Sequence, residues 1–466
     1  MKTGGDQSKS SVAADPVESL ADGLPTPRRY WAGLTILLGI GICVIDAAMV
    51  NVALPTIAQA LAIEASTAVW IINAFQLTVV VTLLPFSSLA ERVGFKRLFR
   101  FGLIGFWIGA IGSALSPSIE LMLIMRVLQG LGASAIMCLF GGLMRHVYPA
   151  KILSRGIAIN AMNVAVTSVL GPTLGSTLLS FADWRWIFVV LTPLIALTAY
   201  TMQYLPDVAT ITRRFDYRSA VLSAIGIGCL ILGLDYLTSY PVIAMATILF
   251  SLLLIAWLVR WSSGQSAPLV PVDLLKIDPL RAATAASACS FAAQMATFVS
   301  LPFYLQTVYG HDPMTVGVLM ASWPLGAAVM AFVAGRLADR VAVSVLCGLG
   351  ASAMALSTLA IILLPQTTEL GWLMAAMALG GVGFGFFQTP NNRALLGSAP
   401  RQRAGAVGGL QALTRVFGQT AGAALVATAF AASQSDGPSF GLIVGMGFAL
   451  LALVVNVRRY FQESRI

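Results

Sequence analysis

The chain has 466 residues, of which 58% are hydrophobic and only 10% are charged. This balance excludes a soluble globular protein of any fold class and is typical of a polytopic membrane protein. The net charge of +9 does not indicate a nucleic-acid partner, because the basic residues gather in loops between apolar runs.

The N-terminal segment, residues 1–29, mixes Ser, Gly, Pro and charges of both signs. It lacks the apolar core of a signal peptide, so we predict a disordered cytoplasmic tail. The five cysteines all lie inside apolar runs, where they act as small hydrophobic residues. The sequence therefore predicts no disulfide framework, no metal site and no cofactor.

Apolar windows of about 20 residues, enough to cross a bilayer core of about 30 Å, recur from Trp31 almost to the C-terminus. We predict an all-α polytopic membrane protein with fourteen spans, at residues 31–54, 68–89, 98–115, 119–143, 157–181, 186–205, 219–237, 242–261, 282–304, 314–333, 341–364, 372–395, 404–431 and 440–457. Lys and Arg fall mainly in alternate loops, which predicts cytoplasmic termini and a multi-pass protein of the plasma (inner) membrane.

Among the charged residues of these spans we single out Asp46, Arg126, Asp235 and Arg415. Each costs about 2.5–3.5 kcal/mol at a helix centre, so such side chains face protein or water. Burial disfavours an ionised carboxylate, whereas a nearby arginine favours it; Asp46 can therefore load and release a proton when its distance from Arg126 changes. Alternatively, Asp46 only contacts Asn51 within the bundle, and Arg126 forms a permanent ion pair. Asp235, near the end of its span, can reach water.

Two pairs of short segments indicate an internal repeat. SSLAER at 87–92 resembles GRLADR at 335–340, and LGPTLGS at 170–176 aligns with FGQTAGA at 417–423, in nearly the same register. The two matches relate span two to span ten and span five to span thirteen, so equivalent spans are eight apart. If fourteen spans were two equal halves, equivalent spans would be seven apart. We therefore predict six plus two plus six helices, with domains at 30–207, 208–265 and 266–458 and tails at 1–29 and 459–466.

Four motifs follow one another along the first half: IDAAMVNVALP in span one, SSLAERVGFKR after span two, RVLQGLGAS in span four and GPTLGS in span five. With these motifs the chain resembles the fourteen-span drug:proton antiporter family of the major facilitator superfamily. Ser87, Glu91 and Ser176 depart from that family's pattern by small-for-small or acid-for-acid changes. The resemblance implies the major facilitator fold and export of small amphipathic compounds in exchange for protons by alternating access.

The resemblance also implies that the loops after spans two and ten act as gates. The gating candidates are Glu91, Arg92, Gly94, Asp339 and Arg340; the alternative is plain anchoring by positive charge. In span five, Gly171, Pro172 and Gly175 remove side chains and one backbone donor, which permits a bent, closely packed helix that suits a seal against proton leak. Passive packing is the alternative there.

Polar side chains in several spans are candidates for a substrate cavity, since such cavities are apolar with a few placed polar groups. They are Asn73, Gln76, Gln294, Tyr304, Trp323, Gln388 and Asn391. A contact between packed helices explains the presence of each of these residues equally well. Asn51, Gln129 and Arg415 are predicted to support the Asp46 and Arg126 pair.

The function that follows is a proton-driven exporter with a small molecule, protons and the lipid bilayer as partners, acting as a monomer. The middle of spans nine to fourteen holds no acid, so the substrate is expected to be a lipophilic monocation that competes for Asp46, or a neutral compound. A dedicated exporter of one metabolite, siderophore or sugar-like compound stays open. A membrane-embedded enzyme or receptor is more distant, because the chain has only two histidines and neither HExxH nor a P-loop.

Overall fold

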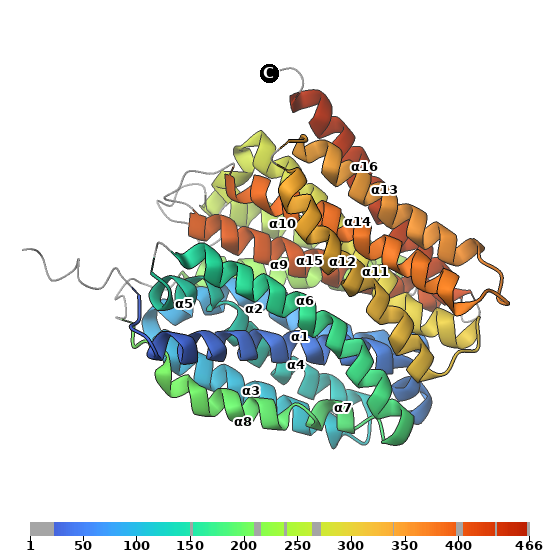
Figure 1. Cartoon of the computed structure of the whole chain (residues 1–466), viewed down its shortest axis with the longest axis horizontal. Helices are drawn as coiled ribbons and strands as arrows, with labels where there is room; N and C mark the ends of the chain where they lie inside the picture. The colour runs from blue at the N-terminus through green and yellow to red at the C-terminus, as the bar shows by residue number, and fades with distance from the viewer. Residues whose placement is uncertain are drawn as a thin grey trace, which may run out of the picture.

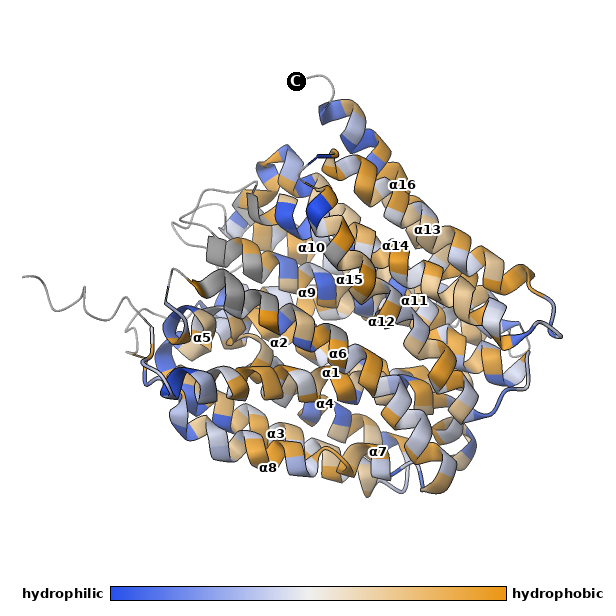
Figure 2. Cartoon of the chain, viewed as in Figure 1, coloured by the Kyte–Doolittle hydropathy of each residue, from blue (hydrophilic) through white to orange (hydrophobic). Residues whose placement is uncertain are grey.

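A computed structural model describes residues 23–149, 152–208, 216–236, 240–262, 272–338, 340–397, 404–433 and 436–463. The regular structure of these residues is entirely helical. Figure 1 shows long helices in two groups, with α1, α3 and α8 in one and α13, α14 and α16 in the other, inclined to the first. Figure 2 shows apolar residues along most of the helix surfaces and polar residues mainly at helix ends and in loops.

The helices of the first half begin close to where the sequence predicts spans. They are α1 (Arg28–Ala60), α2 (Ala65–Val93), α3 (Phe95–Ala114), α4 (Ile119–Met137), α5 (Phe140–Val147), α6 (Leu153–Phe181), α7 (Trp186–Val189) and α8 (Thr192–Thr201), which the short 3-10 helix Met202–Tyr204 extends. Predicted spans four and six are thus each divided, at Cys138–Leu139 and at Val190–Leu191.

The remaining helices are α9 (Tyr217–Asp235), α10 (Pro241–Ser262), α11 (Asp278–Thr307), α12 (Pro313–Leu337), α13 (Val343–Leu363), α14 (Leu370–Gly397), α15 (Ala404–Ala432) and α16 (Gly437–Glu463), with a 3-10 helix at Val272–Lys276 before α11. α16 extends past Val457, where the predicted last span ends, and includes residues that the sequence assigns to a tail.

Twelve helical segments of the described chain are long and apolar enough to cross a membrane. The chain is therefore a multi-span integral membrane protein. The other two predicted spans correspond to α3 and α15, which are 20 and 29 residues long but are interrupted by polar or charged residues such as Arg100 and Arg415. The count of fourteen stays a prediction.

The paired glycines of the sequence repeat have the same packing role in the two halves. A Cβ on Gly171 would overlap the Ala48 side chain, so α6 lies tightly on α1. A Cβ on Gly418 would lie 2.5 Å from the Ala288 carbonyl oxygen, so α15 lies as closely on α11. Small residues allow such backbone approach within a membrane. The two halves therefore place equivalent helix pairs around their interiors.

The halves meet along two seams, one between α6 and α12 and the other between α2 and α15. Ser176, near the end of α6, faces Gly317, near the start of α12; a Cβ on this glycine would overlap Ser176 and lie 2.9 Å from the Pro172 carbonyl oxygen. Both helices run to the lower right of Figure 1, where they meet. This end of the α6–α12 seam is closed.

The hairpin of α9 and α10 packs outside the second seam. α9 contacts both α2 and α15, and the Thr428 hydroxyl donates to the Leu234 carbonyl oxygen at 3.0 Å. Leu84 and Leu258 are buried together, with Leu222 and Leu413 packed against them. The hairpin thus joins the two halves through apolar contacts and through the hydrogen bond from Thr428.

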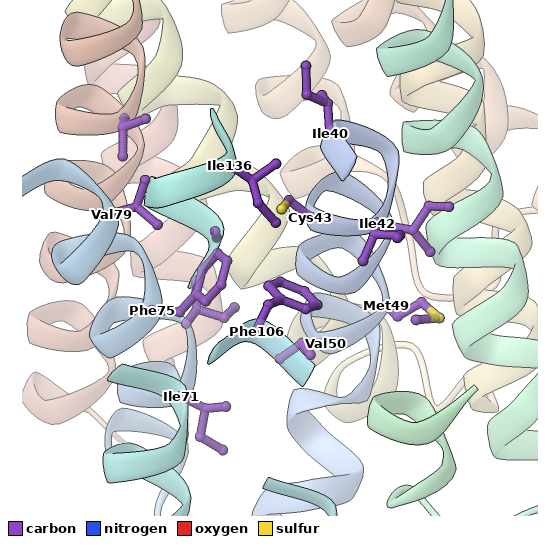
Figure 3. Close-up of a cluster of buried hydrophobic side chains, with 14 of the residues drawn as sticks. Ile40, Ile42, Cys43, Met49, Val50, Ile71, Phe75, Val79, Phe106 and Ile136 are labelled. Carbon is purple, nitrogen blue, oxygen red and sulfur yellow. The ribbon is translucent and has the colours of Figure 1, made fainter. Parts of the chain in front are cut away.

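The interior of the first half is an apolar cluster between α1, α2, α3 and α4. Figure 3 shows Cys43, Phe75, Phe106 and Ile136 pointing toward one another. All four are less than a tenth exposed. The polar groups of α1 and α4 are consequently surrounded by hydrocarbon.

The closed seam generates a prediction about conformation. We expect Gly317→Ala to separate the ends of α6 and α12, because its methyl group has no room beside Ser176. The measurement is a spin-label distance between these ends on a cysteine-free background, and the population with a longer distance should increase.

Gly447→Ala is the matched control, because a Cβ on this α16 glycine meets nothing within 4 Å. It should leave the distance distribution unchanged. An unchanged distribution in Gly317→Ala as well would show that the seam is not closed by this contact.

Candidate functional site

Asp46 lies in the middle of α1 and is fully buried. Its carboxylate accepts two hydrogen bonds, one by each oxygen. Arg126 Nη1 donates to Oδ2 at 2.8 Å, and Gln129 Nε2 donates to Oδ1 at 2.8 Å. The structure thus brings together the three side chains that the sequence singled out on spans one and four.

Arg126 is held by groups from α1, α2 and α4, and the Phe188 ring of α7 lies 5.8 Å from its guanidinium carbon. Besides Asp46, its Nε donates to the Ile71 carbonyl oxygen at 3.0 Å and its Nη1 donates to Gln129 Oε1 at 2.7 Å. The guanidinium carbon lies 4.4 Å from the centre of the Phe75 ring, a cation–π geometry. The Asp46 and Arg126 side chains are each only 1% exposed.

The helix geometry explains this convergence. Arg126 and Gln129 are three positions apart on α4 and therefore share a face, and that face meets α1 and α2. Two unpaired charges would be very costly in this apolar interior, whereas a hydrogen-bonded pair has no net charge. Each Asp46 oxygen accepts one of the two hydrogen bonds from α4, so the group joins the middle of α1 to α4.

The two other residues predicted to support the pair lie elsewhere. Asn51 is 5% exposed, and its Oδ1 has no hydrogen-bond partner. It is not bonded to Asp46 through any contact of the described residues. Arg415 lies on α15, in the other half of the chain.

The predicted gating residues lie at helix ends. Gly94 joins α2 to α3 with φ of +95°, a conformation that favours glycine. Glu91 and Arg340 are exposed, and Arg92 is half-buried; Asp339 lies outside the described residues. Lys96 Nζ, in the same loop, donates to the Gln203 carbonyl oxygen at 3.1 Å and so ties the start of α3 to the end of α8.

The span-five motif forms the contact between α6 and α1. Gly175 lies against Met49, where a Cβ would be 3.1 Å from the Met49 Cα. Pro172 lies within α6, which continues through it. Gly171 packs one turn earlier against Ala48, only two residues from Asp46. The motif therefore fixes the position of the α1 segment that carries the acid.

The predicted cavity residues divide into two groups. Asn73 is fully buried with neither side-chain atom bonded, and Gln76 Nε2 approaches Met295 Sδ at 3.5 Å across the two halves. Gln294 and Gln388 are half-buried. Among the described residues, both polar atoms of Asn73, the Gln76 carbonyl oxygen and also Trp323 Nε1 are buried without a hydrogen-bond partner.

The other three lie in helix contacts. Tyr304 is buried in an apolar cluster of α11 and α12, and Trp323 packs against Phe298, with ring centres 5.6 Å apart. Asn391 Nδ2 donates to the Ala283 carbonyl oxygen at 3.0 Å and to Ser287 Oγ at 2.7 Å, which joins α14 to α11.

Arg459 is a structured residue that the sequence prediction missed by placing it in a tail. It is 5% exposed, donates from Nη1 to Asn391 Oδ1 at 3.3 Å and from Nε to Glu463 Oε1 at 2.9 Å. Ser344 Oγ in turn donates to Glu463 Oε2. The i, i+4 spacing of Arg459 and Glu463 was a signal that the last helix continues.

The sequence matches the profile of the Major Facilitator Superfamily over residues 36–423. The chain belongs to this superfamily. It is 39% identical to the uncharacterized transporter YebQ of Escherichia coli strain K12 over 447 residues, which are 95% of this chain and 98% of that protein. It is also 27% identical to the riboflavin transporter RibZ of Clostridioides difficile, covering 89% of this chain and 91% of RibZ.

Relatives of this superfamily member include multidrug efflux proteins. The multidrug export protein EmrB of Escherichia coli strain K12 is 30% identical over 308 residues, 64% of this chain and 59% of EmrB. Among solved structures, a POT family transporter has a TM-score of 0.72 at 12% identity, covering 94% of this chain and 96% of its own. A bacterial homologue of the transporter Spinster has a TM-score of 0.67 at 15% identity, covering 93% and 97%. These likenesses show the fold, and the superfamily indicates a transporter of small molecules.

The buried pair generates a stability prediction. Arg126→Gln leaves Asp46 charged and unpaired. We therefore expect the free energy of unfolding to decrease by about 3–5 kcal/mol and the melting temperature in detergent to fall clearly. Asp46→Asn combined with Arg126→Gln removes both charges and should recover most of that loss.

Arg185→Gln is the control, because Arg185 and its partner Asp183 are 43% and 52% exposed and exposed pairs contribute little. Equal melting temperatures for the single Arg126 variant and the double variant would contradict the coupling of these charges.

Proposed function

We propose that the protein is a secondary active exporter that expels small amphipathic compounds in exchange for protons. The observation that carries this proposal is the hydrogen-bonded group of Asp46, Arg126 and Gln129 inside an apolar six-helix bundle. Intramembrane acids are costly and usually serve transport. No cofactor takes part, and the proton gradient drives the cycle.

Proton uptake would act through the geometry of this group. A proton on Asp46 neutralises the carboxylate, and Arg126 then keeps Gln129, the Ile71 carbonyl and the aromatic rings beside it as partners. The lost attraction lets α1 move relative to α4. Because Gly171 and Gly175 hold α1 tightly against α6, the movement is passed to the α6–α12 seam, which opens and closes in alternating access.

The proposed topology has fourteen spans arranged as six plus two plus six, with α3 and α15 as spans and α9–α10 as the inserted pair. Basic residues such as Arg97 and Arg100 support a topology with both termini in the cytoplasm, by the positive-inside rule. The protein acts in the plasma (inner) membrane as a monomer. We propose that Glu91 and Arg92 at the end of α2, and Asp339 and Arg340 after α12, gate its cytoplasmic side.

A second candidate is a transporter dedicated to one metabolite, which the similarity to a riboflavin transporter favours. Both candidates use the same proton site. They differ in the breadth of substrates, so resistance of cells to a panel of unrelated toxic compounds separates them.

The central prediction concerns Asp46→Asn, which cannot cycle a proton. We expect the variant to insert and fold, because the asparagine carbonyl oxygen can still accept a hydrogen bond from Arg126, but to lose gradient-driven transport by at least about tenfold. The measurement is dissipation of an imposed pH gradient in proteoliposomes on addition of ethidium, riboflavin or 5-dimethylaminonaphthalene-1-sulfonate.

Asp183→Asn is the matched control, since this exposed acid lies in the loop after α6, and it should retain transport. Undiminished gradient-driven transport by Asp46→Asn would refute the role of Asp46. Failure of every compound to change the gradient with the unmodified protein would refute proton antiport.

A further inference from the structure

α15 carries a row of three polar side chains, Gln411, Arg415 and Gln419, spaced one helical turn apart. Each is half-buried. Within the described part of the chain none of the three has a side-chain hydrogen bond, and Arg415 has no ion pair. Arg126 and Arg459, the two other arginines buried in the helices, are both paired with carboxylates.

The contacts of α15 show where this row faces. Gly418 and Gly422 lie against α11, and Leu413 packs with Leu84 of α2. Successive residues of an α-helix are rotated by about 100° about its axis. Viewed along α15, Arg415 therefore lies about 60° and Gln419 about 100° from Gly418, between the side that faces α11 and the side that faces α2. α9 contacts another side of α15, through Thr428. The row therefore lies next to the α11 contact, on the side of α15 that is turned away from α9.

Among the described residues no acid is paired with Arg415, and Glu463, the acid of α16, is bonded to Arg459. Helices α12, α13, α14 and α15 contain no Asp or Glu, and in α11 the only acid is Asp278 at its first position. Asp46 is already engaged through both oxygens by Arg126 and Gln129. A guanidinium within the bilayer without an anion is costly, so this position favours a ligand that brings a negative charge.

We propose that Arg415 binds the anionic head group of the transported compound, with the neighbouring glutamines as neutral hydrogen-bond donors. The inference rests on the proposed transport function and gives its substrate class: amphipathic molecules with a carboxylate, sulfonate or phosphate. Arginine suits such groups because its planar fork donates two parallel hydrogen bonds. The expectation of a lipophilic cation that competes for Asp46 is thereby replaced.

The test is equilibrium binding to the full-length protein in phosphatidylcholine nanodiscs without a proton gradient. The probes are 5-dimethylaminonaphthalene-1-sulfonate and its neutral sulfonamide, which share one apolar body. The unmodified protein should bind the sulfonate more tightly. Arg415→Gln should lower the affinity for the sulfonate by about 10- to 100-fold, because a charged hydrogen bond is lost. Its affinity for the sulfonamide should stay nearly unchanged. Arg415→Lys should retain most of the affinity for the sulfonate.

Arg458→Gln is the control for net charge, because Arg458 is an exposed arginine near the end of α16, and it should leave both affinities unchanged. Three outcomes would overturn the proposal: unchanged sulfonate affinity in Arg415→Gln, equal weakening of both probes, or no preference of the unmodified protein for the sulfonate. Equal weakening would show that Arg415 only maintains the packing.

A lipid phosphate could occupy the same site, since it offers the same chemistry. Repeating the measurement with phosphatidylglycerol in the nanodiscs distinguishes the sources: strong competition assigns the site to a lipid head group, and no competition assigns it to the diffusible compound. Asp46→Asn should keep full sulfonate binding. Loss of proton coupling and loss of anion binding are thus observed separately, so either proposal can fail without the other.

Discussion

The arrangement of the first half depends on one constraint, which is that the Asp46 carboxylate is buried where no water reaches it. Its two oxygens are satisfied by Arg126 and Gln129, and Arg126 in turn needs the Ile71 carbonyl and the Phe75 ring. These requirements fix the mutual positions of α1, α2 and α4. A bundle built around a neutralised pair changes shape when one partner changes charge, because the remaining partner cannot stay unpaired at low dielectric.

The two halves pack their helices in the same way, but they differ in the charged residues that these helices carry. Gly171 and Gly418 hold equivalent helix pairs together, which is why the repeat is visible in the sequence at these positions. The first half holds a compensated acid and base, while the second half has Arg415 without an acid beside it. Similar packing with unequal charges is consistent with our proposal that the first half handles the proton and the second half binds the substrate.

Much of the fold could be predicted from the sequence because bilayer thickness sets the length of apolar runs and Gly, Pro and charge mark their ends. Asp46, Arg126 and Gln129 could be predicted as one site because buried charges in a membrane must find partners. The breaks at Cys138–Leu139 and Val190–Leu191 lie within continuous apolar runs, and hydropathy does not distinguish a break there from an unbroken helix. Arg459 was missed because an Arg-rich helix end has the composition of a solvated tail.

The substitution at Ser176 shows why local motifs leave part of a structure undetermined. The family pattern has glycine there, and a serine alone suggests looser packing. In the fold, Ser176 meets Gly317 of α12, so the small residue is supplied by the opposite helix and the seam stays closed. The two residues are 141 positions apart, and no spacing rule within α6 relates them. Contacts between the halves depend on how both bundles dock, and this is the part of the transport cycle that changes as the seams open and close.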